Sequence, residues 1–270
     1  MSIEQMQEGI IQDNCESKGR SYFSIQKPKR KYKSASFFAG WADIEKIKGL
    51  EAWRNRIGKD AAQAITNKAA TSGTKIHSAN EGKDVELTNV EKKKQMFHQN
   101  LMDKIQITFQ EQKILWIDPE DDEVGFGGTF DCLAYIPTGS LVQEGTDYGV
   151  STNKYMIIDW KNSKIKEAGM CLGYYLQASA YMAGLNQLTN KEFAVTEGLI
   201  SVASSRTHKI MHINQEQSLW YWKNFKEIVR CYAKNEKFDW YAFADESRGK
   251  YDPETAMIKG YLPNYLEVKK

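Results

Sequence analysis

The sequence lacks paired cysteines and long apolar runs. Its four cysteines stand singly along the 270 residues, with no CxxC pair among them. This spacing disfavours a zinc ribbon and a disulfide framework. No run of about 18 apolar residues occurs, so we predict no membrane-spanning helix, and residues 1–20 contain no apolar segment like that of a signal peptide. These absences predict a soluble protein of the cytoplasm, with no membrane partner.

The chain also lacks a large excess of charge. Lysine and arginine number 37 against 35 aspartates and glutamates, which gives a formal net charge of +2. A protein that coats nucleic acid is usually far more basic, so binding to nucleic acid would need a local patch. Residues 27–33, KPKRKYK, form a basic run. Either this run is a solvated segment, or it contacts phosphate through Lys29, Arg30, Lys31 and Lys33.

The pattern of polar and apolar residues divides the chain into two parts. We expect residues 1–33 to be a flexible basic segment and residues 34–270 to form a single domain. Within that domain we expect N-terminal helices over 34–82, a core over 110–214 and a C-terminal helical part over 215–270.

The first predicted helix carries three aromatic side chains. Ser36 is expected to cap it, and Phe37, Phe38 and Trp41 follow. These rings either pack into the core or present a surface on which bases can stack. A longer, alanine-rich helix is expected from about residue 60 to 81.

Several later segments are rich in β-branched and aromatic residues and predict strands. A long loop is expected over 137–154, a helix over 167–186 and an amphipathic helix over 215–236. The predicted strands are 113–118, 127–136, 155–161, 197–205 and 208–213. This order predicts an α/β domain whose mixed central sheet is flanked by helices.

Two acidic residues lie in strands that otherwise look buried. Asp131 is in the middle of GGTFDCLAYI, and Asp159 follows the apolar run 155–158. A buried, unpaired carboxylate costs several kcal/mol, so each acid needs a partner or a metal ion. Lys161 lies two residues after Asp159, and side chains at i and i+2 of a strand point to the same face.

The pair of Asp159 and Lys161 is, by itself, also explained by a structural salt bridge. Its combination with Asp131 favours a metal site, because neighbouring strands lie roughly 5 Å apart and would bring the two carboxylates together. Two carboxylates can hold a divalent cation through oxygen ligands, while the lysine stabilises developing charge or activates water.

Four motifs in this region resemble those of RecB-like nucleases in the PD-(D/E)XK superfamily. Two of them are GTFD and DWKNS, which resemble the G-x-x-D and D-W-K-T/S motifs of that family. A Q-x-x-x-Y motif follows, and a G-T-x-x-H-x-x-x-E helix precedes them. The matching residues are 128–131, 159–163, Gln177 with Tyr181, and 73–81. The stretch 36–205 is also similar to the mitochondrial genome-maintenance exonuclease family and its phage relatives.

The resemblance implies a restriction-endonuclease-like fold and a centre that binds Mg²⁺ or Mn²⁺. Glu81 is either a solvated residue or a partner of the metal ligands, and Lys164 and Lys166 either contact phosphate or lie in a solvated loop. The residues that the resemblance assigns to metal binding are His77, Asp131, Asp159 and Trp160 (through its carbonyl), and those it assigns to catalysis are Asp131, Asp159, Lys161, Gln177 and Tyr181.

The function implied is that of a metal-dependent DNA exonuclease acting from single-stranded ends, in DNA recombination, repair or degradation in a bacterial or phage-infected cell. Its expected partners are DNA and a separate helicase or single-strand-binding protein, because the chain has no GxxxxGK[ST] motif of its own. The scattered cysteines predict no iron–sulfur cluster. The alternatives are a structure-specific or partner-dependent endonuclease and a non-catalytic nucleic-acid-binding scaffold on the same fold.

Overall fold

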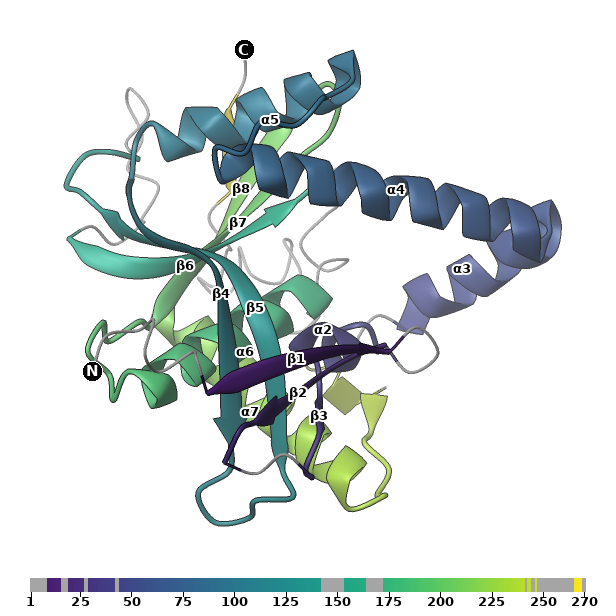
Figure 1. Cartoon of the computed structure of the whole chain (residues 1–270), viewed down its shortest axis with the longest axis vertical. Coiled ribbons are helices and arrows are strands. Elements are labelled where there is room, and N and C mark those ends of the chain that lie inside the picture. Colours follow the sequence, from purple (N-terminus) through teal and green to yellow (C-terminus); the bar gives the residue numbers. More distant parts are fainter. Residues whose placement is uncertain are drawn as a thin grey trace.

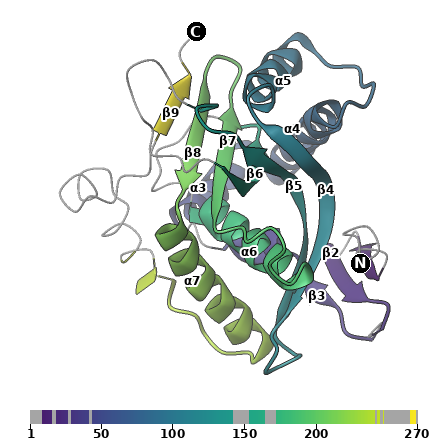
Figure 2. The same cartoon turned by 90° about the vertical axis from the view of Figure 1, so that its left-hand side faces the viewer.

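In the computed structural model, the described residues form an α/β fold around a large central sheet (Figures 1 and 2). A small three-stranded sheet, built from N-terminal residues, lies beside it. No helix among these residues is both long enough and apolar enough to cross a membrane. The structure describes residues 9–15, 19–26, 29–41, 44–141, 153–163, 172–240, 242–243, 246 and 265–268.

The central sheet has six strands. They are β4 (Gln106–Ile117), β5 (Gly125–Ile136), β6 (Lys154–Lys161), β7 (Glu197–Ala203), β8 (His208–Ile213) and β9 (Tyr265–Val268), and they lie in this order across the sheet. All neighbouring strands are antiparallel except β6 and β7, which run parallel. The predicted mixed sheet is therefore confirmed.

Helices cover both faces of this sheet (Figure 2). Helices α6 (Leu172–Leu188), α7 (Gln215–Ala233) and the short α2 (Ala35–Ala39) lie over one face, and α5 (Asn89–Met102) lies against the other. Helix α6 connects the parallel strands β6 and β7, as a crossover requires. The sequence pattern predicted α6 and α7 but not α5.

The N-terminal residues form a sheet. Tyr22 is fully buried there and packs on the backbone of β5. The prediction of a flexible segment over 1–33 is wrong for these strands, because buried aromatic side chains anchor a sheet whose other residues are mostly polar. The strands are β1 (Ile10–Cys15), β2 (Gly19–Ser24) and β3 (Tyr32–Lys33), paired antiparallel in that order.

Two consecutive glycines of β5 let aromatic rings approach the backbone closely. A Cβ atom at Gly127 would lie 2.2 Å from the Tyr22 side chain, and one at Gly128 would lie 2.5 Å from the Tyr181 ring. Successive residues of a strand point to opposite faces, so the pair admits one tyrosine on each face. The N-terminal sheet and α6 are thereby joined to the same short stretch of β5.

Helix α2 begins earlier than the sequence pattern predicts. The Ser34 hydroxyl caps it by accepting a hydrogen bond of 3.1 Å from the amide of Phe37, so the assignment of the cap to Ser36 is wrong. Phe38 is 2% exposed and belongs to the core, whereas Trp41 is 52% exposed. Core packing is thus confirmed for Phe38 and does not account for Trp41.

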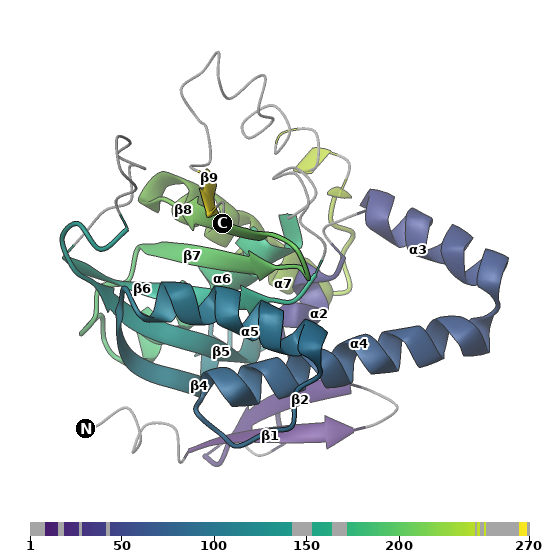
Figure 3. The same cartoon turned by 90° about the horizontal axis from the view of Figure 1, so that it is seen from above.

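Helices α3 (Ile44–Ile57) and α4 (Lys59–Asn80) form a helical arm that extends away from the sheet (Figure 3). Gly58 joins them with a φ of 90°, which glycine adopts without steric cost. Most side chains in the first half of α4 are exposed, whereas Ile76 near its end is fully buried. The arm therefore packs against the rest of the protein mainly at the C-terminal end of α4, near the central sheet.

Candidate metal centre and its cavity

Two strands of the central sheet bring Asp131 and Asp159 together. Cys132 of β5 pairs with Ile158 of β6, and one further step of this antiparallel register places the two aspartates opposite each other. The backbone amide of Trp160 donates a hydrogen bond of 2.7 Å to Asp131 Oδ2. Asp131 is 9% exposed and Asp159 is fully buried. The predicted closeness of the two carboxylates is confirmed.

Glu111 of β4 brings a third carboxylate to the same place. Its neighbours Gln110 and Gln112 pair with Cys132 and Phe130, so Glu111 lies across from Asp131. Glu111 has a positive φ of 49°, an uncommon conformation for a residue other than glycine. Backbone strain of this kind costs on the order of 1–3 kcal/mol and occurs most often at functional sites.

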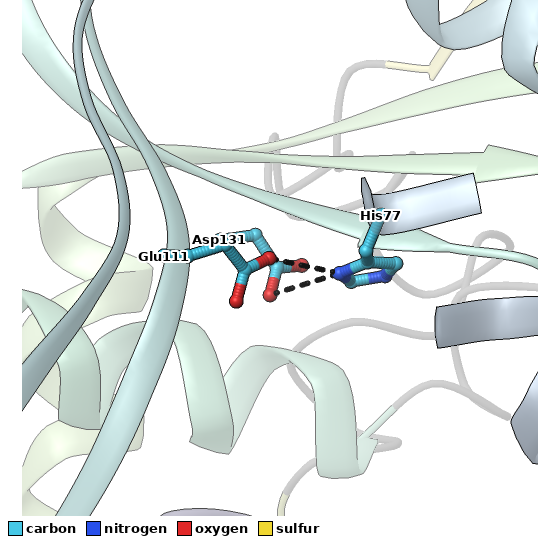
Figure 4. A group of neighbouring side chains, drawn as sticks. All are labelled: His77, Glu111 and Asp131. Atoms are coloured by element: carbon cyan, nitrogen blue, oxygen red, sulfur yellow. Dashed lines mark hydrogen bonds and ion pairs between the residues drawn. The ribbon is translucent and has the colours of Figure 1, made fainter. Parts of the chain in front are cut away.

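His77, near the end of α4, faces these carboxylates (Figure 4). Its Nδ1 lies 3.1 Å from Glu111 Oε1 and 3.6 Å from Asp131 Oδ1. Its Nε2 lies 3.2 Å from the carbonyl oxygen of Trp160. The candidate ligand atoms of His77, Glu111 and Asp131 all lie within 4.8 Å of one another, so these three residues could hold a metal ion.

The ligand types of this group suit particular metals. Carboxylate and carbonyl oxygens favour Mg²⁺ and Mn²⁺, and an imidazole favours Mn²⁺ over Mg²⁺. The two cysteines whose side chains the structure describes, Cys132 and Cys231, are not part of the group. The residues present therefore fit the ions that the sequence led us to expect.

Burial and charge together shift the pKa values in the group. Burial disfavours the charged form of His77, but Asp131 and Glu111 outweigh it and raise the pKa of His77 to about 9. Burial raises the pKa of Asp159 to about 6 despite the neighbouring ammonium of Lys161. Burial likewise raises the pKa of Asp131. Crowding of buried carboxylates is relieved when a cation binds between them.

Lys161 begins a chain of hydrogen bonds beside this group. Its Nζ lies 2.9 Å from Asp159 Oδ1 and donates to Gln177 Oε1 at 3.3 Å. Gln177 Nε2 in turn donates to the hydroxyl of Tyr181 at 2.8 Å. Burial lowers the pKa of Lys161, but Asp159 and Asp131 more than compensate, so its pKa is raised and it carries a positive charge.

These residues border one cavity of about 620 Å³. Glu81 also lines it and forms an ion pair of 2.8 Å with Lys83. The structure thus brings the residues predicted for catalysis and metal binding together in one place. The predicted residues lining the cavity are His77, Glu81, Asp131, Lys161, Gln177 and Tyr181, with Asp159 beneath Lys161 and the Trp160 carbonyl beside His77.

The basic run at 29–33 does not border the cavity. Lys31 forms an ion pair of 2.5 Å with Asp13, and Arg30 pairs with Asp122. The charges of both are therefore compensated within the protein. Lys29 is exposed outside the cavity, and the Lys33 ammonium lies 5.3 Å from the centre of the Phe37 ring.

Lys164, Lys166 and most of the 137–154 loop lie outside the described residues. The assignment of phosphate contacts to the two lysines therefore stays a prediction.

Sequence reasoning missed several residues of the cavity. Glu111 was missed because its strand was predicted to begin at residue 113, although β4 begins at Gln106. The available signal was an acid two residues before a predicted strand that neighbours the strand of Asp131 in the sequence. Arg20 and Tyr22 were missed because the N-terminal sheet was not predicted.

No protein-family model and no curated protein sequence matches the chain. Among solved structures, the chain is similar to the crystal structure of SSO0001, with a TM-score of 0.38 and 10% identity, over 77% of this chain and 88% of that one. A likeness of this degree carries no conclusion about function.

Proposed function

We propose that this protein is a metal-dependent nuclease of the PD-(D/E)XK type that hydrolyses phosphodiester bonds of DNA from single-stranded ends. The observation that carries the proposal is the gathering of Asp131, Glu111, His77 and the charged Lys161 around one cavity, with Asp159 paired to Lys161 beneath it. The four motifs that resemble the RecB-like family meet at this cavity. The expected setting is DNA recombination, repair or degradation in a bacterial or phage-infected cell.

The residues divide the chemistry among themselves. A divalent ion bound at this site would lower the pKa of water and polarise a phosphoryl oxygen. Asp131, Glu111 and His77 would hold it, and the resemblance adds Asp159 and the carbonyl of Trp160, which lies beside His77. The Lys161 ammonium stabilises negative charge that develops on the phosphate. Gln177 and Tyr181 hold that ammonium in place through their hydrogen bonds.

The charge of the helical arm favours a single-stranded substrate. Between residues 49 and 75 its exposed cations are Arg54, Arg56, Lys59 and Lys68, against the acids Glu51 and Asp60. The arm is therefore basic in a protein of nearly neutral charge. A basic arm rooted at the metal site suits a flexible strand that is guided toward the cavity.

Digestion of linear and circular single-stranded DNA of the same sequence tests this function. With Mg²⁺ or Mn²⁺ we expect the linear strand to be degraded and the circle to persist, and excess EDTA to stop the reaction. Nicking of the circle would establish an endonuclease instead. Failure of the folded protein to cleave any DNA with either metal would refute the nuclease.

Metal binding is expected to release a proton from His77. Because its pKa is about 9 in the metal-free protein, His77 is protonated at pH 7 and must lose this proton to bind an ion. The apparent affinity for Mn²⁺ should then rise about tenfold between pH 7 and pH 8. Calorimetry in two buffers of different ionisation enthalpy measures the proton count. His77→Gln should release about one proton fewer, and equal proton release in the two proteins would exclude His77 as a ligand.

A further inference from the structure

The cavity has a second wall that comes from the N-terminal part of the chain. Besides the candidate metal ligands, the cavity is lined by Arg20 and Tyr22 of β2 and by Ser34 and Ser36 at the start of α2. None of these four residues was expected to lie near the site. In Figure 1, β1, β2 and α2 lie beside the lower part of β4 and β5.

This wall is held firmly against β5. Tyr22 is fully buried over Gly127, and its hydroxyl donates a hydrogen bond of 3.0 Å to Gln12. Ser34 forms a β-bridge with Gly127. Arg20 lies two residues before Tyr22 on the same strand, and residues spaced by two point to the same face. The fixed position of Tyr22 therefore directs Arg20 toward β5 and the cavity.

The charge of Arg20 differs from that of the other cations around the cavity. Lys161 is paired with Asp159, Lys83 with Glu81 and His77 with Glu111. Arg20 is exposed, and no acidic partner of it occurs among the residues that the structure describes. An arginine whose guanidinium is not in an ion pair is suited to bind a phosphate through two parallel hydrogen bonds.

We propose that Arg20, with the exposed hydroxyl side chain of Ser36, forms a phosphate-binding subsite for a nucleic-acid strand whose neighbouring phosphate lies at the metal centre. This inference rests on the proposed nuclease function and adds the wall that holds the substrate. Unlike Arg30 and Lys31 of the run at 29–33, which are paired with acids, Arg20 lines the cavity itself.

A binding titration tests the subsite without cleavage. Fluorescence anisotropy monitors the binding of a labelled single-stranded oligonucleotide in EDTA at a series of salt concentrations. Each phosphate contact on a single strand contributes about 0.7 to the slope of log affinity against log salt. Arg20→Gln should therefore reduce the slope by about 0.7 and weaken binding about fivefold at roughly 0.1 M salt. Arg20→Lys should retain the slope, since it keeps the charge.

Arg30→Gln is the matched control, because Arg30 is also in the N-terminal part but lies outside the cavity, paired with Asp122. It should bind like the wild type. If Arg20→Gln keeps the wild-type slope while the wild type cleaves DNA, the subsite is refuted and the nuclease stands. If the slope falls as expected but the wild type cleaves nothing with Mg²⁺ or Mn²⁺, the subsite stands and the nuclease is refuted.

Discussion

Replacing Asp159 with alanine is expected to abolish cleavage while leaving the protein folded. Asp159 is fully buried, lies opposite Asp131 and pairs with Lys161 at 2.7 Å. Its removal takes away a proposed metal ligand and leaves Lys161 without its partner. The loss of several kcal/mol of transition-state stabilisation corresponds to a rate at least ~10³-fold lower. Asp131→Ala and Lys161→Ala should lose activity to a similar degree.

The measurement is the initial rate on linear single-stranded DNA, with folding checked by thermal unfolding. Asp118→Ala is a matched control, because Asp118 is also a buried aspartate paired with a lysine, Lys226, at 2.8 Å. Asp118 does not line the cavity. The Asp118→Ala protein should be less stable than the wild type, but under conditions where it is folded it should cleave DNA at the wild-type rate. Wild-type rates in a folded Asp159→Ala protein would remove the proposed centre.

A buried pair of histidines is expected to make the protein unstable in mild acid. His98 Nδ1 lies 2.9 Å from Ser201 Oγ, and the same hydroxyl lies 2.7 Å from His208 Nε2. His98 is fully buried, and His208 is 2% exposed. Burial lowers the pKa of His98 to about 3 and that of His208 to about 4. Both rings are therefore neutral in the folded protein at pH 5.

The direction of the effect follows from proton binding. In the unfolded chain a histidine has a pKa of about 6.5, so between pH 6.5 and 4 the unfolded state binds more protons than the folded state. Stability is therefore lost as the pH falls through this window. Between pH 7 and 5 each of His98 and His208 should cost about 2 kcal/mol of unfolding free energy.

Chemical denaturation of the wild type and His208→Gln at pH 7 and pH 5 isolates this contribution. The variant is expected to be less stable at pH 7 but to lose about 2 kcal/mol less on acidification. For His77 the contribution to stability changes with pH in the opposite direction, and His77→Gln tests this. The pKa of His77 is raised to about 9, so its contribution is present below pH 6.5 and is lost as the pH rises through 9. Equal acid sensitivity of the wild type and His208→Gln would show that His208 is not held neutral.

The sequence predicted the central part of the fold well, because its strands carry strong local signals. Runs of β-branched and aromatic residues predicted β5 and β6. The acids within these runs, Asp131 and Asp159, predicted the candidate metal site. The closeness of Asp131 and Asp159 followed from the pairing of those two strands. Such features depend on a few neighbouring residues and on the most common strand pairing.

The rest of the site depends on contacts that local patterns do not reveal. The strands β1 and β2 look polar, and the buried ring of Tyr22 fits only because Gly127 lies beneath it. Glu111 reaches the site through a positive φ in the middle of a strand. The basic run at 29–33 was conspicuous in the sequence, yet the acids that pair with two of its residues, Lys31 and Arg30, come from other segments and are Asp13 and Asp122.

The walls of the cavity come from residues as far apart in the chain as Arg20 and Tyr181. Contacts between distant segments form slowly in folding, because a large loop must close before they gain any energy. The cavity is therefore complete only after α6 has been synthesised and packed. A nascent chain that ends before α6 lacks Gln177 and Tyr181. Such a chain therefore lacks the wall of the cavity that positions the Lys161 ammonium.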